Sequence, residues 1–210
     1  MTAIKICGIT RLQDAEAAAR LGAHAIGLVF YRPSPRYVDP GQAAAIAQSV
    51  PPFITCVGLF VDPEPAWVEE VIRTVPLQLL QFHGDEPPAF CARYGLPFIK
   101  AVRVRPGLDL LEYSVRYREA RGLVLDSYRA GVPGGTGERF DWSLVPGTLP
   151  LPVILSGGLT PENVAEAILA VRPWAVDVSS GVEADKGIKD WGKMAAFIDG
   201  VRNADVRLAR

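Results

Sequence analysis

Cys7 and Asp126 carry the side chains in this sequence that are best suited to acid–base chemistry. Cys7 lies two positions after Lys5 in the apolar segment IKICGI, and Asp126 follows the apolar residues GLVL. A thiolate can remove a proton from carbon, and a nearby cation such as Lys5 lowers the pKa of a thiol. A carboxylic acid can donate a proton, although an ordinary aspartic acid is almost fully ionised at pH 7. The two residues therefore suit a base and an acid, provided that their surroundings activate both.

Each of these residues also has a purely structural interpretation. Free cysteine usually packs as a small hydrophobe, and the residue pattern leaves both roles open for Cys7, whereas Cys56 and Cys91 lie in apolar segments and are expected in the core. The carboxylate of Asp126 could instead be held in a turn by backbone N–H groups, but its place at the end of a predicted strand favours a titrating group. His83 is equally consistent with a substrate contact and with a packed loop residue.

Two segments rich in glycine and serine are typical of anion binding. SGGLTPENV, at 156–164, places two glycines before a predicted Thr-Pro helix start, and DVSSGVE, at 177–183, has a similar turn. Backbone N–H groups at a helix N-terminus attract phosphate, and glycine lets it approach closely. Tight turns alone would explain the glycines, but two such segments together favour a phosphate site. The candidate contacts are Gly157, Gly158, Ser179 and Ser180. A third segment, VPGGTGERFDW at 132–142, is either a flexible loop or a further phosphate contact.

The composition excludes several other classes of protein. With 210 residues and 49% hydrophobic content, the chain can bury a full core. Twenty-two basic and 23 acidic residues give a net charge of -1, which is too balanced to bind nucleic acid or an anionic membrane by overall electrostatics. No apolar run approaches the roughly 18 residues of a membrane span, and the first residues do not resemble a secretion signal, so a cytoplasmic location is expected. Three cysteines and two histidines without metal-ligand spacing predict no disulfide framework and no metal site.

The candidate residues must be positioned by strands that alternate with helices. Eight short segments are apolar on both faces, as in a buried parallel sheet, and they cover 4–9, 25–30, 53–61, 77–84, 97–104, 122–127, 152–158 and 175–181. Amphipathic segments lie between them, and Thr10 and Gly22 are expected to cap the first of these helices. The segment PEPAWVEEVIRTV opens a later helix with proline. The shortest connection, at 140–149, is expected to form one or two turns of helix.

This alternation predicts an α/β protein with one domain, residues 1–210, folded as a (β/α)8 TIM barrel. An open doubly wound sheet is the alternative, but it would favour a G-x-G-x-x-G motif after the first strand, which KICGITRLQ lacks. The active site of a barrel lies at the carboxyl ends of its strands, where His83 and Asp177 are also expected. Strands one and six are three places apart in a ring of eight, so Cys7 and Asp126 should face each other across the mouth.

The ordered set of motifs resembles the phosphoribosylanthranilate isomerases of tryptophan biosynthesis. The resemblance covers nearly the whole chain, and it rests on KICGIT at 5–10, GLVF followed by SPR at 34–36, VGLFV at 57–61, QFHGDE at 81–86, LDS at 125–127, GGTGERFDW at 134–142, SGGLTPENV at 156–164, DVSSGVE at 177–183 and GIKD at 187–190. A single glycine motif is weak, but the ordered set is specific. Phe82 and Ser156 depart from the residues common in the family, and Ser156 could alter a phosphate contact.

The resemblance implies a cofactor-free Amadori rearrangement of N-(5-phosphoribosyl)anthranilate to 1-(2-carboxyphenylamino)-1-deoxyribulose 5-phosphate. By analogy, Asp126 protonates the ribose ring oxygen and opens the ring to a Schiff base, and Cys7 then removes the C2 proton. Arg36 would hold the anthranilate carboxylate. The other implied substrate contacts are Lys5, His83 and Asp177, and the implied phosphate contacts are Gly135, Gly137, Gly157, Gly158, Ser179 and Ser180. The family occurs as monomers or homodimers that bind a small phosphoribosyl substrate.

Two alternative functions can be compared with this one through particular residues of the sequence. The aldose–ketose isomerase of histidine biosynthesis runs the same type of rearrangement, but it resembles two fused half-barrels with aspartates as both acid and base. This chain has Cys7 on its first strand and no half-length repeat. A non-catalytic phosphosugar-binding barrel should have lost Cys7 or Asp126, and both are present. The sequence therefore favours the tryptophan-pathway isomerase.

Overall fold

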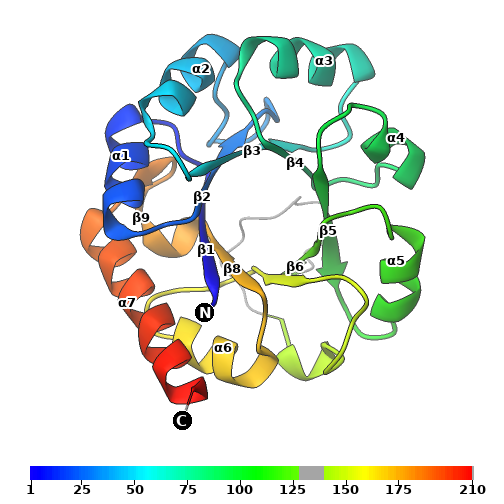
Figure 1. Cartoon of the computed structure of the whole chain (residues 1–210), viewed down its shortest axis with the longest axis vertical. Coiled ribbons are helices and arrows are strands. Elements are labelled where there is room, and N and C mark those ends of the chain that lie inside the picture. The colour runs from blue at the N-terminus through cyan, green and yellow to red at the C-terminus, as the bar shows by residue number, and fades with distance from the viewer. Residues whose placement is uncertain (128–139, 210) are drawn as a thin grey trace.

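Eight parallel strands close into a barrel, with helices around the outside, in the computed structural model, which describes residues 1–127 and 140–209 (Figure 1). The strands are β1 (Ala3–Cys7), β2 (Ala25–Val29), β3 (Thr55–Phe60), β4 (Leu79–Phe82), β5 (Phe98–Val104), β6 (Leu123–Ser127), β7 (Val153–Leu155) and β8 (Ala175–Val178). Each overlaps one of the eight predicted segments, and the predicted (β/α)8 barrel is confirmed.

The helices and short elements connect these strands in chain order. They are α1 (Leu12–Leu21), α2 (Pro40–Ser49), α3 (Pro65–Thr74), α4 (Pro88–Ala92), α5 (Leu110–Arg116), the 3-10 turn η1 (Trp142–Leu144), α6 (Val164–Val171), the 3-10 turn η2 (Ser180–Val182), the hairpin β9 (Glu183–Asp185) and β10 (Ile188–Lys189), and α7 (Trp191–Leu208). The short turn predicted at 140–149 is η1. None of the helices that the structure describes is long and apolar enough to cross a membrane.

At α1 the predicted signal holds for the end of the helix but not for its start. Gly22 ends α1 with a left-handed φ of 106°, which a residue without a side chain adopts at little cost. The expectation that Thr10 caps the start of α1 is wrong, because α1 begins at Leu12 after Arg11 and has no side-chain cap. The Thr10 hydroxyl donates to the Gly187 carbonyl of the β9–β10 hairpin instead.

The barrel closes because β1 pairs with both β2 and β8. Lys5 lies opposite Ala25 on β2 and opposite Asp177 on β8. Side chains alternate along a strand, so the residues that face the interior recur with period two. Near the amino ends of the strands these positions form an apolar layer made of Ile99, Ala101, Val124, Ile154 and Ala175.

The same alternation places polar side chains higher in the barrel, toward the carboxyl ends of the strands. Two residues beyond Val124 of the apolar layer comes Asp126, and two beyond Ala175 comes Asp177. Both carboxylates are buried. One apolar layer therefore seals the bottom of the barrel, and the positions next along each strand form the floor of a polar site.

The outer faces of the strands pack against the helices in one large apolar cluster. Phe82, which departs from the residue common in the resembled family, lies at its centre. Its ring centroid lies 6.1 Å from that of Phe60 and 6.1 Å from that of Phe98. Aromatic pairs of this kind contribute about 0.5–1.5 kcal/mol beyond the burial of their surface. Phe82 therefore points away from the interior, while its neighbours Gln81 and His83 point into it.

Candidate active site

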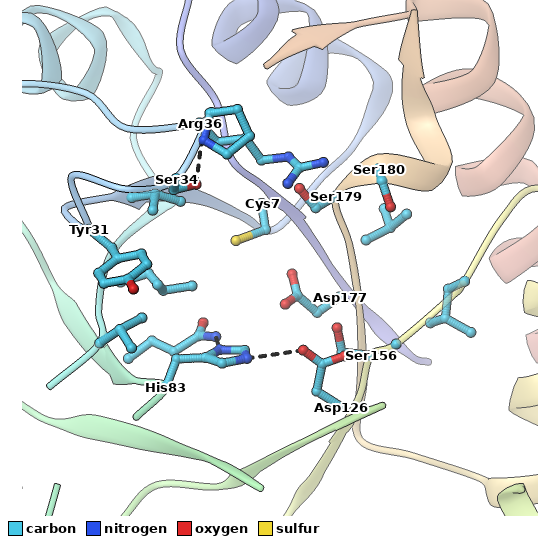
Figure 2. Close-up of a pocket in the computed structure, with 18 of the residues that line it drawn as sticks. Cys7, Tyr31, Ser34, Arg36, His83, Asp126, Ser156, Asp177, Ser179 and Ser180 are labelled. Carbon is cyan, nitrogen blue, oxygen red and sulfur yellow. Dashed lines mark hydrogen bonds and ion pairs between the residues drawn. The ribbon is translucent and has the colours of Figure 1, made fainter. Parts of the chain in front are cut away.

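A pocket opens at the carboxyl ends of the strands and brings most of the predicted site residues together (Figure 2). Its lining includes Cys7, Arg36, His83, Asp126, Gly157, Gly158, Asp177, Ser179 and Ser180. Cys7 and Asp126 come from β1 and β6 and lie on opposite sides of the pocket, as predicted (Figure 2). Lys5 lies two residues before Cys7 on β1, deeper in the barrel, where it contacts Asp177. Gly135 and Gly137 lie outside the described residues.

The Cys7 thiol lies in a buried and charged environment. Burial raises its pKa, while the positive charge of Lys5 acts to lower the pKa and the negative charge of Asp177 acts to raise it. The net pKa lies above the ordinary value, so the expected effect of Lys5 is right in sign but smaller than the effect of burial. Gly27 on the neighbouring strand makes room for the thiol, because a Cβ there would lie 2.6 Å from the sulfur.

Lys5 and Asp177 form a buried ion pair at the floor of the pocket. Lys5 Nζ donates to Asp177 Oδ1 at 2.9 Å, and both side chains are almost fully buried. Although burial acts to lower the pKa of Lys5, attraction to Asp177 and to Cys7 raises it above its ordinary value. Lys5 therefore stays charged, and it faces the thiol as a permanent cation.

Asp126 is held from two sides by hydrogen bonds. Its Oδ2 lies 3.0 Å from His83 Nε2, and its Oδ1 accepts a hydrogen bond from the Ser127 backbone N–H at 2.8 Å. His83 Nδ1 in turn lies 3.0 Å from the amide nitrogen of Gln81. The three side chains project into the barrel from β4, the residue that follows it, and β6. Histidine beside a carboxylate is an arrangement that can share a proton.

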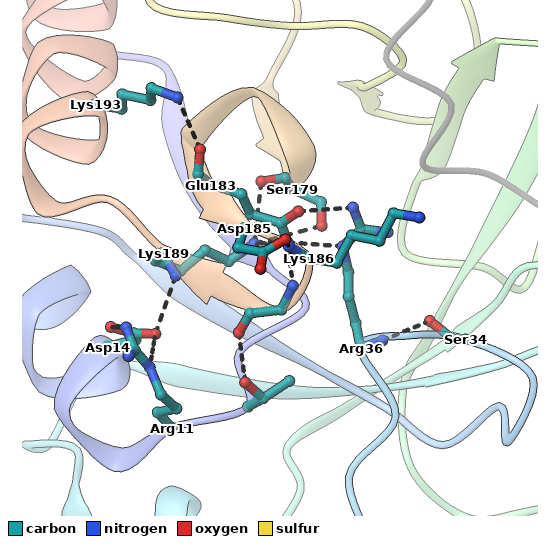
Figure 3. A network of polar contacts seen from close by, with 12 residues as sticks. Arg11, Asp14, Ser34, Arg36, Ser179, Glu183, Asp185, Lys186, Lys189 and Lys193 are labelled. Carbon is teal, nitrogen blue, oxygen red and sulfur yellow. Dashed lines mark hydrogen bonds and ion pairs between the residues drawn. The ribbon is translucent and has the colours of Figure 1, made fainter.

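Arg36 enters the pocket from the loop after β2 and is already paired with a carboxylate (Figure 3). Its Nε and one terminal nitrogen donate to the two carboxylate oxygens of Glu183, at 2.7 and 2.8 Å. This bidentate hydrogen bonding raises the pKa of Arg36. Lys189 Nζ also donates to Glu183 Oε1 at 3.0 Å and to the Ser179 carbonyl oxygen at 3.0 Å.

Sequence reasoning missed Glu183, Lys189 and the role of Gln81. Each lies in a quoted motif, namely DVSSGVE, GIKD and QFHGDE. A charged or amide side chain in each of these segments could have indicated a polar contact in the site, because turn formation does not require such a side chain. The partner of Glu183 could not be read from spacing, since Arg36 and Glu183 are 147 positions apart along the chain.

The turns after β7 and β8 line the pocket, although the helix after β7 begins later than predicted. Gly157 and Gly158 have left-handed φ values of 78° and 68°. A Cβ at Gly157 would lie 2.5 Å from the Ser127 backbone nitrogen, so glycine is needed there for close approach. The expected helix start at Thr160 is wrong, because α6 begins at Val164. Asn163 forms a turn before it by accepting from the Thr160 N–H and donating to the Gly158 carbonyl.

The fold and the pocket place the molecule among the (β/α)8-barrel enzymes with an active site at the carboxyl ends of the strands. A family model described as N-(5'phosphoribosyl)anthranilate (PRA) isomerase matches residues 4–200. The chain belongs to this family. It is thus an isomerase of tryptophan biosynthesis, in agreement with the resemblance that the motifs indicated.

Relatives and solved structures agree with this assignment. The chain is 61% identical over 198 residues to N-(5'-phosphoribosyl)anthranilate isomerase of Nitrosospira multiformis, covering 94% of this chain and 95% of the relative. It is 63% identical over 195 residues to that of Thiobacillus denitrificans, covering 93% and 95%. The solved enzyme from Thermotoga maritima superimposes with a TM-score of 0.87 at 43% identity, covering 97% of this chain and all of that one (100%).

A further solved member of the family is described in complex with reduced 1-(o-carboxyphenylamino)-1-deoxyribulose 5-phosphate. It has a TM-score of 0.84 and 42% identity, and the match covers 97% of this chain and 100% of that chain. A compound of this kind carries both a carboxylate and a phosphate group.

Proposed function

We propose that Asp126 is the general acid and Cys7 the general base of a cofactor-free Amadori rearrangement of N-(5'-phosphoribosyl)anthranilate. The observation that carries the proposal is the placement of these two groups on opposite sides of one pocket. An acid and a base that face each other can act on neighbouring atoms of one bound sugar without exchanging places.

In the first step, Asp126 transfers its proton to the ribose ring oxygen. The bond from C1 to that oxygen breaks, and the anthranilate nitrogen supplies the electron pair that forms the protonated Schiff base. In the second step, the Cys7 thiolate removes the C2 proton, and the electrons of that bond form the C1–C2 double bond of an enolamine. The enolamine then takes up a proton at C1 and loses one from the C2 hydroxyl, giving the ketone.

The pocket lining holds groups that suit the two anionic groups of this substrate. Arg36 is proposed to hold the anthranilate carboxylate, with its guanidinium oriented by Glu183. Gly157, Gly158, Ser179 and Ser180 are proposed to bind the phosphate, because their backbone lines the pocket. The ligand described for the solved relative supports a site that holds both groups, since it has a carboxylate and a phosphate. Lys5, Asp177 and His83 complete the proposed set of substrate contacts.

The proposal is tested by following the loss of anthranilate-type fluorescence when purified protein meets freshly generated phosphoribosylanthranilate. Cys7→Ala and Asp126→Asn should each lower kcat by at least about a hundredfold, because each removes one partner of the acid–base pair. Cys56→Ala is the matched control, since Cys56 is a buried cysteine of β3 outside the pocket lining. Full activity in either pocket variant would show that its assigned role is wrong.

The oligomeric state is proposed as a monomer or a homodimer. A solved structure of the Thermotoga maritima relative is described as monomers generated from a dimeric enzyme, which supports both forms within the family. The cytoplasmic location stays a prediction from the sequence.

A further inference from the structure

Gln81, His83 and Asp126 form a chain of hydrogen bonds that runs from the barrel interior to the pocket. The Gln81 amide nitrogen lies 3.0 Å from His83 Nδ1, and His83 Nε2 lies 3.0 Å from Asp126 Oδ2. The amide nitrogen can only donate, so Nδ1 is the acceptor in this arrangement. The proton of a neutral His83 therefore sits on Nε2 and points at the Asp126 carboxylate.

This arrangement fits an ionised Asp126 but not a His83–Asp126 pair that holds an extra proton. With two protons on the pair, one lies between Nε2 and Oδ2, since placing both there would bring two protons together. We assign the other to Nδ1, because an imidazole nitrogen is more basic than a carboxylate oxygen and Asp126 Oδ1 already accepts from the Ser127 N–H at 2.8 Å. A pair protonated in this way needs an acceptor at the position now held by the Gln81 nitrogen.

A half-turn of the Gln81 amide supplies that acceptor by exchanging its nitrogen for its oxygen. Gln81 is completely buried, and its Oε1 has no hydrogen-bond partner among the described residues. Rotation therefore breaks no second hydrogen bond of the oxygen. An unpartnered buried polar atom costs about 1–3 kcal/mol, and one end of the amide is unpartnered in either orientation. The protonation of the neighbouring pair is thus free to decide which orientation is preferred.

We propose that Gln81 is a positioning residue for the acid step, an inference that rests on the assignment of Asp126 as the general acid. The Gln81 amide donates to His83 when Asp126 is ionised. It accepts from His83 when the pair has taken up one proton from solvent. Asp126 passes that extra proton to the ribose ring oxygen, and the pair returns to its single proton on His83.

The other charged groups around the pair come from several elements. Arg103 on β5 donates to the His83 carbonyl at 3.3 Å, and Lys100 donates to the Gly84 carbonyl at 2.6 Å. Among the described residues, the other titratable or charged side chains that share the pocket, or contact one that does, include Lys5, Cys7, Tyr31, Arg36, Asp177, Glu183 and Lys189. Variants of Gln81 leave all of these groups in place, so a change in the protonation of His83 reports on the amide.

Nitrogen-15 NMR of the imidazole rings tests the proposal directly, because the chain has only two histidines. His24 is an internal reference, since its Nδ1 accepts from the Ile4 N–H at 3.1 Å. In the unaltered protein, His83 Nδ1 should be unprotonated at alkaline pH and gain a proton as the pH falls. In Gln81→Met, which has neither donor nor acceptor, Nδ1 should gain its proton only at lower pH.

Kinetics of the same variants test whether this coupling serves the reaction. Gln81→Met should lower kcat by roughly tenfold and leave KM within about twofold, because the substrate contacts remain. Gln81→Glu presents only acceptors, so it should keep Nδ1 protonated to higher pH and recover most of kcat. Gln78→Met is the matched control, since Gln78 bonds to the Cys56 N–H and the Pro76 carbonyl outside the pocket.

Each outcome decides one part of the proposal. A His83 proton on Nδ1 at alkaline pH in the unaltered protein would overturn the inferred arrangement. Unchanged protonation of His83 or unchanged kcat in Gln81→Met would overturn the positioning role, even if Gln81→Glu failed to fold. Retained activity in Asp126→Asn would instead overturn the assignment of the acid, and the NMR result would stand independently of it.

Discussion

The two sides of the pocket are built in opposite ways. Around Cys7, on the β1 and β8 side, cations and anions alternate in buried ion pairs, with Lys5 bound to Asp177 at 2.9 Å and Lys189 bound to Glu183 at 3.0 Å. Asp126, on the other side, bonds to an imidazole and to a backbone N–H. Fixed cations stabilise a thiolate, which is the form of a thiol that can accept a proton. A neighbouring group that shares its proton instead helps a carboxyl group to act as an acid.

The comparison also shows why the basic side chains around Cys7, on the β1 and β8 side of the pocket, need their own anions. Three basic side chains, Lys5, Arg36 and Lys189, have most of their surface buried near the thiol, and an unpaired buried cation is strongly unfavourable. Asp177 and Glu183 neutralise these charges, but Asp177 acts against the thiolate by raising the pKa of Cys7. The charge arrangement around the proposed base is therefore a compromise between folding and reactivity.

Among the charged residues around Cys7, removal of Lys5 should have the largest effect on stability and activity. Lys5→Met leaves Asp177 as a buried carboxylate without its partner, which costs about 3–5 kcal/mol of the free energy of unfolding. It also removes the cation that acts to lower the pKa of Cys7, so kcat should fall as well. Urea denaturation and steady-state kinetics measure the two effects. Lys186→Met, at an exposed lysine of the β9–β10 turn, is the control and should change neither.

Glu183→Gln should have an intermediate effect on the kinetics, mainly on substrate binding. It should also lower the free energy of unfolding, because the buried cations Arg36 and Lys189 lose their anion. Arg36 loses a charged bidentate partner and Lys189 loses its carboxylate, so the guanidinium is held less firmly at the end of the pocket. We expect KM to rise about tenfold, which corresponds to about 1.4 kcal/mol, with kcat changed much less. Glu69→Gln, at an exposed glutamate of α3, should leave both parameters unchanged. An equal loss in kcat would place Glu183 in the chemical step instead.

Asp177→Asn should have the smallest effect on the kinetics and would sharpen the comparison through pH. It also leaves Lys5 as a buried cation without its partner, so the free energy of unfolding should fall by about 3–5 kcal/mol, as for Lys5→Met. The negative charge of Asp177 raises the pKa of Cys7, so its removal lowers that pKa and more thiolate is present at a given pH. The rising limb of kcat/KM against pH should therefore move to lower pH than in the unaltered protein. A shift to higher pH would show that Asp177 helps the base through Lys5 more than it opposes the thiolate directly. Asp199→Asn, at an exposed aspartate of α7, is the control.

Much of the fold and of the pocket lining could be predicted from local patterns. Apolar segments separated by caps and prolines located all eight strands, and strand ends identified Cys7, His83, Asp126 and Asp177 as neighbours in space. The start of α6 could not be predicted, because Thr160 and Pro161 are a good helix start by type. Asn163 bonds to Thr160 and Gly158 instead and keeps the turn non-helical.

The sequence by itself determined the barrel and the family and singled out Cys7 and Asp126 as the candidate base and acid, because periodicity, turn residues and ordered motifs are local properties of the chain. Only the tertiary structure decided how those groups are tuned. The pairing of Lys5 with Asp177, of Arg36 with Glu183 and of Gln81 with the His83–Asp126 pair depends on strand register around a closed ring. Burial, which outweighs Lys5 at the thiol, depends on everything packed around Cys7. Desolvation and charge pairing act through space, and no spacing along the chain encodes their balance.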